Sequence, residues 1–264
     1  MTSKFNIHPV PTSRIATMDV CAISRHKNHV VGLMEFDVTA VRKKIREERR
    51  RGVETSFNAH VVFAICQALK KHPQMASFLK NKKQQIVFDS ISVSMIVEKE
   101  VNHQKVPFPL LITEAEQKSV SEIFKLIEDS KSMKMGKKEI VLHKKGQKWE
   151  KLYYRLPSFF RKFFWKYLLA HPQFAFSNMG NVSITSLGSA GSINGWFIHK
   201  SIHPVSFGIG SVIQKPIVKN NEIVAADILN MSILFDHDVV DGAPIVRFVR
   251  DLKIEIEKNG LISK

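Results

Sequence analysis

The sequence predicts an α/β fold, and three observations favour it. Stretches rich in β-branched and aromatic residues, partly alternating with polar ones, recur along the chain and indicate strands. Between them lie segments whose apolar residues follow the spacing of an amphipathic helix. The chain has 264 residues, 44% of them hydrophobic, which is ample for a buried core. No low-complexity linker divides it, and the length suits one large domain or two small ones.

The N-terminal third is predicted to form three helices and a strand. A short helix begins near Ser13, and a strand follows over Val30 to Phe36. The strongly charged helix at 40–51, AVRKKIREERRR, is followed by a glycine, which is a common helix stop. Ser56 can cap the next helix, whose apolar run from Val61 to Leu69 identifies it as a core helix.

The middle of the chain is predicted to contain strands, a loop and another helix. Residues 85–97, QIVFDSISVSMIV, are rich in β-branched residues and indicate one or two strands. Residues 100–111, EVNHQKVPFPLL, are interpreted as a loop in which His103 is a candidate channel residue. An amphipathic helix is expected over Ser119 to Met133.

The most unusual segment, at about residues 134–172, combines a basic tract with an aromatic helix. Its second half reads LPSFFRKFFWKYLLAHP, and Ser158 can cap a helix there. At helical spacing one broad face collects Phe160, Phe163, Phe164, Tyr167 and Leu168, and the other collects Arg161, Lys162 and Lys166. This helix, at 157–169, can pack on its own domain or on a neighbouring subunit. It can also lie on an anionic membrane or cover a lipophilic chain, and the sequence leaves these roles open.

The C-terminal third is predicted to be rich in strands and to end in a helix. Val182 to Gly188 indicates a strand with a glycine turn, and residues 195–204 indicate a loop. The segment at 205–235 is typical of antiparallel strands joined at residues 219–221. The final amphipathic helix is expected from Pro244 to about Lys258.

The turn between the last strand and the last helix carries a candidate base. It reads Asp236-His237-Asp238-Val239-Val240-Asp241-Gly242, which contains the spacing His-x-x-x-Asp-Gly. A histidine can accept a proton near neutral pH, and a carboxylate four positions later can fix the turn or bind a cation. The pair is interpreted as a base with its support. The alternative is a surface histidine in a turn whose aspartate and glycine satisfy backbone geometry alone.

The residues around this turn resemble a known active-site signature. The segment SILFDHDVVDGAPIVRFVRDLKIEIE is similar to that of the dihydrolipoyl acyltransferase component of 2-oxoacid dehydrogenase complexes, and more distantly to the motif of chloramphenicol acetyltransferase. Three further stretches agree in the same order, namely SRIATM at 13–18, FNAHVVFAICQALKKHPQMASFL at 57–79 and VSITSLG at 182–188. The chain departs from the family before Val106, where the usual Gly-Leu turn is missing.

This resemblance implies a single catalytic domain over residues 1–264, a two-layer, mixed-sheet α/β sandwich of the CoA-dependent acyltransferase type. It also implies a role for each matching residue. His237 would be the general base that removes the proton from an attacking thiol or hydroxyl. Thr185 would donate a hydrogen bond to the oxyanion of the tetrahedral intermediate, with Ser186 as the second choice. Asp241 would hold the His turn, and Arg14 is the best match to a family arginine that pairs with it. The alternatives are an ordinary strand threonine and a surface arginine.

The resemblance also implies substrates and an assembly. The acyl donor would be acyl-CoA, although no CoA-binding residue can be assigned, and the acceptor would be a dihydrolipoyl-type thiol or another small molecule. Family members form trimers in which the histidine of one subunit faces the hydroxyl of the next, so we expect a homotrimer with active sites at the subunit interfaces. No lipoyl domain precedes Ser13, which makes a separate lipoyl-carrying protein a candidate partner. We expect neither a covalently bound lipoyl group nor a metal in this chain.

The composition narrows the class of protein further. The formal net charge of +16, with a pI of about 9.8, attracts phosphates, anionic lipids and nucleic acid alike. No motif of a nucleic-acid-binding protein accompanies it, so nucleic acid is not an expected partner. Cys21 and Cys66 lie in apolar surroundings, as buried thiols in a reducing compartment do. The sequence contains no signal peptide and no long apolar run, so the cytoplasm is the expected location.

Three other functions stay open on the sequence. One is a non-catalytic trimeric scaffold that keeps the fold, against which the presence of His237, Asp241 and Thr185 argues. Another is a membrane-associated binding protein that acts through residues 157–169. Among enzymes, the alternative is an antibiotic O-acetyltransferase. Tests of CoA binding, vesicle binding and survival on chloramphenicol distinguish them.

Overall fold

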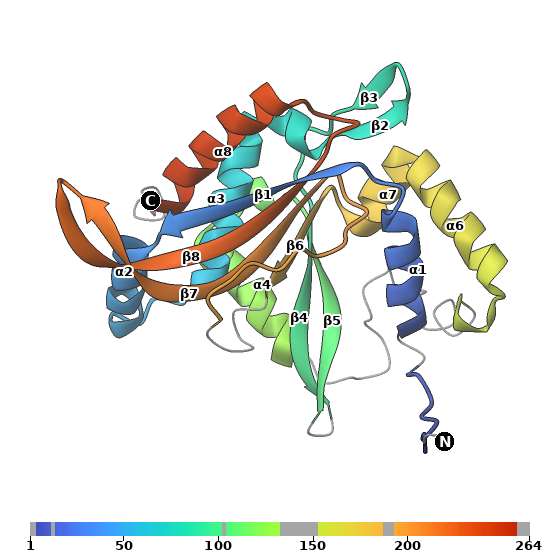
Figure 1. The fold of residues 1–264 in the computed structure, drawn as a ribbon, viewed down its shortest axis with the longest axis horizontal. Helices are drawn as coiled ribbons and strands as arrows, with labels where there is room; N and C mark the ends of the chain where they lie inside the picture. The colour runs from blue at the N-terminus through green and yellow to red at the C-terminus, as the bar shows by residue number, and fades with distance from the viewer. Residues whose placement is uncertain (1–3, 12–13, 102–103, 133–152, 187–192, 258–264) are drawn as a thin grey trace.

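A six-stranded mixed sheet organises the structure, a computed structural model that describes residues 4–11, 14–101, 104–132, 153–186 and 193–257. The strand order is β1-β8-β7-β6-β4-β5 (Figure 1). The strands are β1 (His29–Asp37), β4 (Val93–Val101), β5 (Gln104–Ile112), β6 (Val182–Ser186), β7 (Val205–Lys219) and β8 (Glu222–Asp236). A separate hairpin consists of β2 (Phe78–Asn81) and β3 (Gln84–Ile86).

The sheet is mixed because β6 runs parallel to both of its neighbours, β4 and β7. The other three pairs are antiparallel. Strands β7 and β8 are joined by Asn220 and Asn221, and both asparagines have the positive φ that a tight two-residue hairpin turn requires. This turn projects beyond the body of the sheet, at the left of Figure 1. The predicted junction at residues 219–221 is therefore confirmed.

Helices cover one face of the sheet and complete two layers. In Figure 1, α3 and α4 lie behind the strands, and α8 lies beside α3. The helices are α1 (Arg14–Ser24), α2 (Thr39–Arg50), α3 (Phe57–Lys71), α4 (Val120–Ser132), α6 (Ser158–Ala170), α7 (Pro172–Met179) and α8 (Gly242–Glu257). Short 3₁₀ turns lie at Pro73–Ala76 and Ala115–Gln117. The predicted two-layer, mixed-sheet α/β fold is confirmed.

The main core lies between the sheet and this helix layer. Because side chains alternate along a strand, every second residue of β6, β7 and β8 enters it. These buried residues include Val182, Ile184, Val205, Phe207, Ile209, Met231, Ile233 and Phe235. The intervening residues face the other side of the sheet, which is therefore free to carry polar groups.

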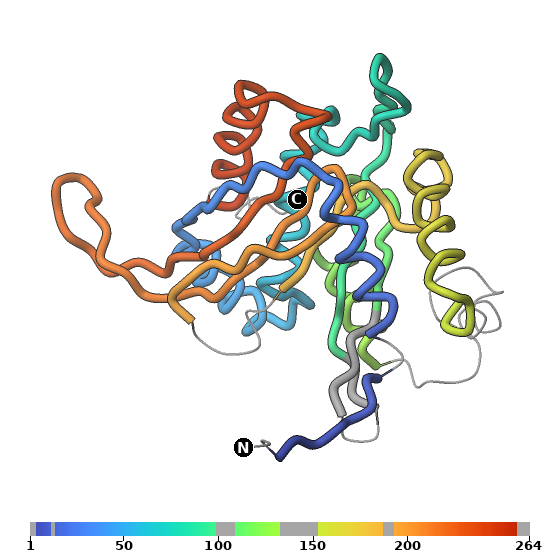
Figure 2. Tube along the Cα trace, turned by 45° about the vertical axis from the view of Figure 1, so that its right-hand side comes forward, coloured from blue at the N-terminus to red at the C-terminus, as the bar shows by residue number. Residues whose placement is uncertain are grey.

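A smaller core holds α6 and α7 at one side of the molecule. In the ribbon and in the Cα tube alike, α6 lies beside α1, far from the β7–β8 turn (Figures 1 and 2). The buried residues of this core are Phe78, Leu168 and Ala175, with Phe88, Trp165, Leu169, Phe176 and Met179 packed around them. None of the helices in the part of the chain described here is long and apolar enough to cross a membrane.

Most predicted elements are confirmed, with corrections that have physical reasons. Residues 104–111, predicted to be part of a loop, belong to β5. This strand is at the edge of the sheet, where prolines are tolerated because one side of its ladder stays unpaired. Ser158 is the first residue of α6 rather than its cap, because Pro157 occupies the capping position. Helix α8 begins at Gly242, two residues before the predicted start at Pro244. His103 lies outside the described residues.

Helix α6 is amphipathic in a different sense from the one predicted. Leu168 is buried, whereas the aromatic residues assigned to the same face are exposed: Phe160, Phe163, Phe164 and Tyr167. Arg161, assigned to the solvent face, is half-buried in an ion pair with Asp19. The grouping of Leu168 with these aromatic residues is therefore wrong, because the ion pair turns the Arg161 side of the helix towards the protein.

Candidate active site

His237 lies in the turn between β8 and α8, and hydrogen bonds fix this turn on both sides. The His237 N–H donates to the carbonyl oxygen of Asn28, 2.9 Å away, just before β1. The Asp236 N–H donates to the carbonyl oxygen of Pro204, also at 2.9 Å, just before β7. Strands β1 and β7 flank β8, so the turn is attached to both neighbouring strands. The exposed His237 side chain is thus presented on a firmly held backbone.

A buried carboxylate beside His237 keeps the turn in shape. Asp236 is 0% exposed, and its Oδ2 forms an ion pair with Lys27 Nζ at 2.6 Å. Its Oδ1 accepts a hydrogen bond from the Asp238 N–H at 3.3 Å. Neither Asp236 nor Lys27 is predicted from the sequence as a functional residue. The sequence signal that could have found them is an aspartate at the end of an apolar strand. Such a carboxylate is expected to be buried, and a buried carboxylate needs a partner.

Asn28 holds the turn from the same side as Lys27. Its Nδ2 donates to both carboxylate oxygens of Asp238, at 3.0 and 3.2 Å. The first residue of β1, His29, is in register with Asp236, and the pairing continues along the whole of β1. The two residues before β1 therefore contact three successive residues of the turn around His237.

Asp241 and Arg14 are far apart in the sequence, and each lies at the start of a different helix. Asp241 is exposed, and its carbonyl oxygen accepts a hydrogen bond from the Ile245 N–H at 3.3 Å, so it stands at the start of α8. Arg14 is exposed and begins α1, an 11-residue helix whose other end leads to Lys27. A helix of that length spans about 16 Å. Among the described residues no ion pair joins Arg14 to Asp241, and their pairing stays a prediction.

Thr185 lies on β6, and a buried amide fixes the start of that strand. Asn181 Oδ1 accepts a hydrogen bond from the Ser92 N–H at 2.9 Å, and its Nδ2 donates to the Ser90 carbonyl oxygen at 3.2 Å. Gly180, just before it, has a φ of 72°, and a Cβ there would lie 2.2 Å from the Ser92 carbonyl oxygen. Only glycine fits this position. These contacts set the register of β6 against β4.

Thr185 and Ser186 lie on opposite faces of the sheet. Val182 and Ile184 are part of the main core. The alternation of a strand therefore places Ser186 on the helix side and Thr185 on the opposite, polar side. This arrangement fits the ranking of Thr185 before Ser186.

The polar side of the sheet around Thr185 is crossed by the chain at residues 193–204. Thr185 is in register with Gly208, and Gly208 is in register with Ser232. The Ser232 hydroxyl donates to the carbonyl oxygen of Phe197 at 2.8 Å. A Cβ at position 208 would lie 2.4 Å from Ser232 Oγ, so glycine leaves room for these contacts.

His237 and Thr185 do not meet within one chain. Through the strand register, Thr185 lies level with Ser232 on β8, which precedes His237 by five residues. That offset is about 16 Å along the strand, and two strand spacings add about 10 Å across the sheet. A base and an oxyanion donor must both reach one substrate by hydrogen bonds. The two side chains of a single chain therefore cannot serve the same reaction centre.

Three histidines near the turn are held in their neutral form by burial. Burial lowers the pKa of His203 to about 4, and its Nε2–H donates to the Met179 carbonyl oxygen at 3.0 Å. Burial also lowers the pKa of His199 to about 4, and its Nε2 lies 2.6 Å from Ser206 Oγ. The pKa of His29 is lowered for the same reason. These imidazoles add no positive charge beside the turn at neutral pH.

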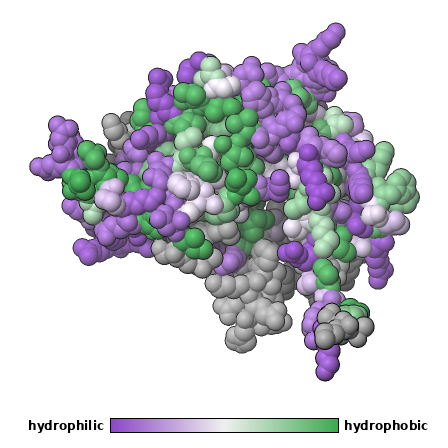
Figure 3. Space-filling view, viewed as in Figure 1, coloured by the Kyte–Doolittle hydropathy of each residue, from purple (hydrophilic) through white to green (hydrophobic). Residues whose placement is uncertain are grey.

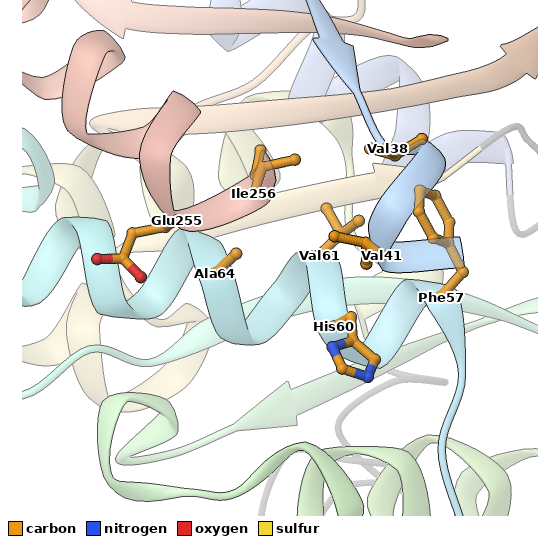
Figure 4. Close-up of a pocket in the computed structure, with 8 residues that line it drawn as sticks. All are labelled: Val38, Val41, Phe57, His60, Val61, Ala64, Glu255 and Ile256. Carbon is orange, nitrogen blue, oxygen red and sulfur yellow. The ribbon is translucent and has the colours of Figure 1, made fainter. Parts of the chain in front are cut away.

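A small cavity lies elsewhere and contains none of the predicted site residues. Figure 4 shows it between α2, α3 and α8, with His60 and Glu255 in its lining. Its volume of about 10 Å³ suits at most a single water. His60 lies 3.6 Å from Glu48, and burial lowers its pKa, as expected for a core histidine. No group of three or more metal-binding side chains that could hold an ion lies within the described ranges.

Comparison with known proteins decides the family. The family model described as 2-oxoacid dehydrogenases acyltransferase (catalytic domain) matches residues 5–140 and 174–262, which is most of the chain. The chain belongs to this family. As a member of the acyltransferase family it is 28% identical, over 244 residues, to the dihydrolipoyllysine-residue acetyltransferase component of the pyruvate dehydrogenase complex of Staphylococcus aureus. The match covers 89% of this chain and 47% of that protein, so the chain spans about half the length of the curated relatives it matches.

Solved structures share the acyltransferase fold. The cubic core of the pyruvate dehydrogenase multienzyme complex superposes with a TM-score of 0.68 at 16% identity, covering 97% of this chain and 95% of that one. The dihydrolipoamide acetyltransferase of Azotobacter vinelandii superposes with a TM-score of 0.68 at 17% identity, with the same coverage of 97% and 95%. Both confirm the arrangement of the two layers.

One segment of the chain is absent from the acyltransferase match. Residues 141–173 fall between the two matched ranges, and they contain the whole of α6. Most of the segment singled out from the sequence as unusual therefore lies outside the ranges that the family model matches.

Proposed function

We propose that this chain is a CoA-dependent acyltransferase domain that moves an acyl group between a CoA thioester and a thiol of the dihydrolipoyl type. The observation that carries the proposal is the exposed His237 on a turn bonded to both neighbouring strands, in a chain of the acyltransferase family. A general base must be accessible to its substrate and held in position, and this turn meets both requirements.

In the proposed reaction His237 takes the proton from the acceptor thiol, and the thiolate attacks the carbonyl carbon of acyl-CoA. A new C–S bond forms while the carbonyl π electrons move to oxygen, and the Thr185 hydroxyl donates a hydrogen bond to this oxyanion. The electron pair then returns, the C–S bond to CoA breaks, and His237 gives its proton to the departing CoA thiolate. Asp241 holds the turn and takes no proton.

The Azotobacter vinelandii enzyme supports these roles. A serine, a histidine and, four residues after the histidine, an asparagine have been studied there for their role in the catalytic mechanism. In this chain His237 and Asp241 have the same spacing, with aspartate in place of asparagine. We assign the hydroxyl of Thr185 to the part of the serine, and Ser186 remains the second choice.

We infer that the active site forms between subunits of a homotrimer. The separation of His237 and Thr185 along the sheet supports this, because one chain alone supplies only half of the site. The relative with the cubic core shows that a domain of this fold forms part of an assembly in that complex. Arg14 would likewise act on the turn of a neighbouring subunit, because it lies about one helix length from the His237 turn of its own chain.

The activity is tested by thiol release from acetyl-CoA with dihydrolipoamide as acceptor. We expect His237→Ala to lower kcat/KM by at least about a hundredfold, as the loss of a general base does. Thr185→Ala should lower kcat by about a hundredfold, whereas Thr185→Ser, which keeps the hydroxyl, should retain most activity. A wild-type protein that binds CoA but transfers no acyl group would direct the search to other acyl chains. If it binds no CoA, the scaffold alternative is favoured.

The shared site is tested by mixing the two inactive variants. When His237→Ala and Thr185→Ala subunits exchange in equal amounts, some interfaces combine an intact histidine with an intact threonine. In a cyclic trimer these make up about a quarter of the sites, so about a quarter of the wild-type activity should return. If both residues acted within one chain, every site of the mixture would stay defective and no activity would return.

The same assay can identify the class of the natural acceptor. A separate lipoyl-carrying protein replaces free dihydrolipoamide in one arm, and chloramphenicol replaces it in another. Faster transfer to the lipoyl protein would support the proposed acceptor class, whereas transfer to chloramphenicol alone would support the antibiotic acetyltransferase. We retain the cytoplasm as the expected site of the reaction.

A further inference from the structure

An aromatic surface is exposed along α6 and continues onto α7. It consists of Phe159 (65% exposed), Phe160 (50%), Phe163 (65%), Phe164 (40%), Tyr167 (48%) and Phe174 (42%). Figure 3 shows apolar side chains at the right edge of the molecule, where α6 lies in Figure 1. Adjacent rings contact one another, with centroid distances of 4.3 Å for Phe159 and Phe160 and 6.1 Å for Tyr167 and Phe174. Residues three or four apart are neighbours on a helix, so the five rings of α6 lie on one surface, and Phe174 extends it onto α7.

The opposite side of α6 is firmly attached to the protein. Asp19 of α1 is 7% exposed and accepts hydrogen bonds from Arg161 Nε and from the Tyr153 hydroxyl, both at 2.7 Å. Trp165 Nε1 donates to the Tyr153 hydroxyl oxygen at 2.9 Å, and Trp165 packs with Leu168 in the smaller core. Removing one partner of a buried ion pair is strongly unfavourable, so this side stays inward. The outward position of the aromatic surface is thus built into the fold.

Positive charge borders the aromatic surface. Lys162 and Lys166 are exposed and lie one helical turn apart beside the row of rings, and Arg155 is exposed just before the helix. Between Glu150 and Glu222 the sequence contains no aspartate and no glutamate. The surface therefore combines exposed aromatic rings with cations that have no acidic neighbour in this segment.

We propose that the aromatic surface binds an anionic lipid membrane, with α6 lying in the plane of the bilayer surface. Aromatic rings are favoured at the boundary between headgroups and acyl chains, and lysines beside them are attracted to lipid phosphates. A helix of 13 residues is about 20 Å long, which suits a position along the surface. Because α6 lies outside the ranges that the family model matches, we assign this property to this chain and not to the family as a whole.

A second copy of the chain fits the aromatic surface less well than a membrane. In a two-fold contact, Lys162 and Lys166 of one copy would face the same lysines of the other. The segment from 151 to 221 supplies no carboxylate to neutralise them, and the whole chain has a net charge of +16. Like charges brought together oppose association, whereas anionic headgroups provide the opposite charge.

The proposal is tested by co-sedimentation of the full chain with vesicles of phosphatidylcholine, with and without phosphatidylglycerol. We expect binding only when phosphatidylglycerol is present. The double variant Phe159→Ser/Phe163→Ser should bind at least about tenfold more weakly, because it removes two apolar side chains from the interface. The matched control, Val218→Ser/Ile223→Ser, removes two apolar residues at the β7–β8 turn that are even more exposed, and it should bind like the wild type.

The contribution of charge is tested separately. Lys162→Gln/Lys166→Gln should weaken binding severalfold and make it less sensitive to salt, whereas Lys80→Gln/Lys83→Gln, on the β2–β3 hairpin, should not. Acyl transfer and far-ultraviolet circular dichroism should be unchanged in all four variants.

Three results would overturn the proposal. One is that the wild type does not bind the anionic vesicles. Another is that Phe159→Ser/Phe163→Ser binds them as well as its control does, which would assign binding to the net charge of the chain. The third is that this variant changes the mass of the assembly in light scattering, which would make the aromatic surface a contact between subunits.

Discussion

Asp236 and Lys27 illustrate how a buried ion pair supports an exposed side chain, here the proposed base His237. Asp236 is 0% exposed, and its carboxylate bonds both the Lys27 ammonium group and the backbone of the turn. Breaking a buried pair by removing one partner typically destabilises a protein by about 3–5 kcal/mol, because an uncompensated charge is left behind. An exposed pair contributes about 1 kcal/mol at most. The burial of an ion pair, rather than the number of ion pairs, decides how much its loss lowers the free energy of unfolding.

We therefore expect Lys27→Met to lower the free energy of unfolding by about 3 kcal/mol and to reduce acyl transfer. Acyl transfer should fall because Lys27 no longer holds the Asp236 carboxylate, which bonds the backbone of the turn beside His237. The control is Lys131→Met, which removes the partner of Glu128 in a pair that is 43% and 46% exposed. Urea denaturation should show a change below about 1 kcal/mol for this control. Equal effects of the two substitutions would contradict the role assigned to Lys27.

Elements with a clear local signal were predictable from the sequence. The β7–β8 turn follows from two adjacent asparagines, and the start of α3 from Ser56, whose Oγ accepts a hydrogen bond from the Ala59 N–H at 3.2 Å. The face of α6 that packs against the protein was not predictable. Periodicity shows which residues share a face, but the face that turns inward is decided here by Asp19, 142 residues away from Arg161.

The same limit applies to the candidate site. The position of His237 between a strand and a helix follows from the motif and the local pattern. Its support by Lys27 does not, because Lys27 and Asp236 are 209 residues apart and no local pattern contains that pair. The separation of His237 from Thr185 also depends on strand order, which becomes visible only when the sheet is assembled.

The junction between α7 and β6 gives a prediction with a matched control. Gly180 and Gly52 both have a positive φ, at 72° and 81°. A Cβ at Gly180 would lie 2.2 Å from the Ser92 carbonyl oxygen, whereas nothing lies within 4 Å of a Cβ at Gly52. Gly52→Ala should therefore lower stability by about 1 kcal/mol, and Gly180→Ala by clearly more. Thermal unfolding compares the two, and equal shifts would show that the contact with Ser92 relaxes easily.

The molecule as a whole should lose stability in acid because it buries neutral histidines. Burial lowers the pKa of His199 and of His203 from 6.5 to about 4. Above pH 6.5 neither the native nor the unfolded chain protonates these groups, and their contribution does not change with pH. Between about pH 6.5 and 4 the unfolded chain binds protons that the native chain does not, so stability falls as the pH decreases.

We expect His203→Gln to flatten this dependence. Glutamine keeps a donor for the Met179 carbonyl oxygen but cannot be protonated in this range. Chemical denaturation at several pH values should show a smaller loss of stability between pH 6.5 and 4 than in the wild type. Replacing the exposed His26 by glutamine is the control, and an equal flattening there would contradict the role of burial.

The pairing of β1 with β8 has a consequence for the order in which the sheet and the His237 turn form. Strands β7 and β8 are neighbours in sequence and can pair from their turn outwards, whereas β1 must find β8 across almost the whole chain. Closing so long a loop is slow compared with forming a hairpin. Only at that late step can the His237 N–H donate its hydrogen bond to the Asn28 carbonyl oxygen. During synthesis, β1 therefore waits for β8, the last strand of the sheet in chain order, and the turn around His237 is completed only after β8 has been translated.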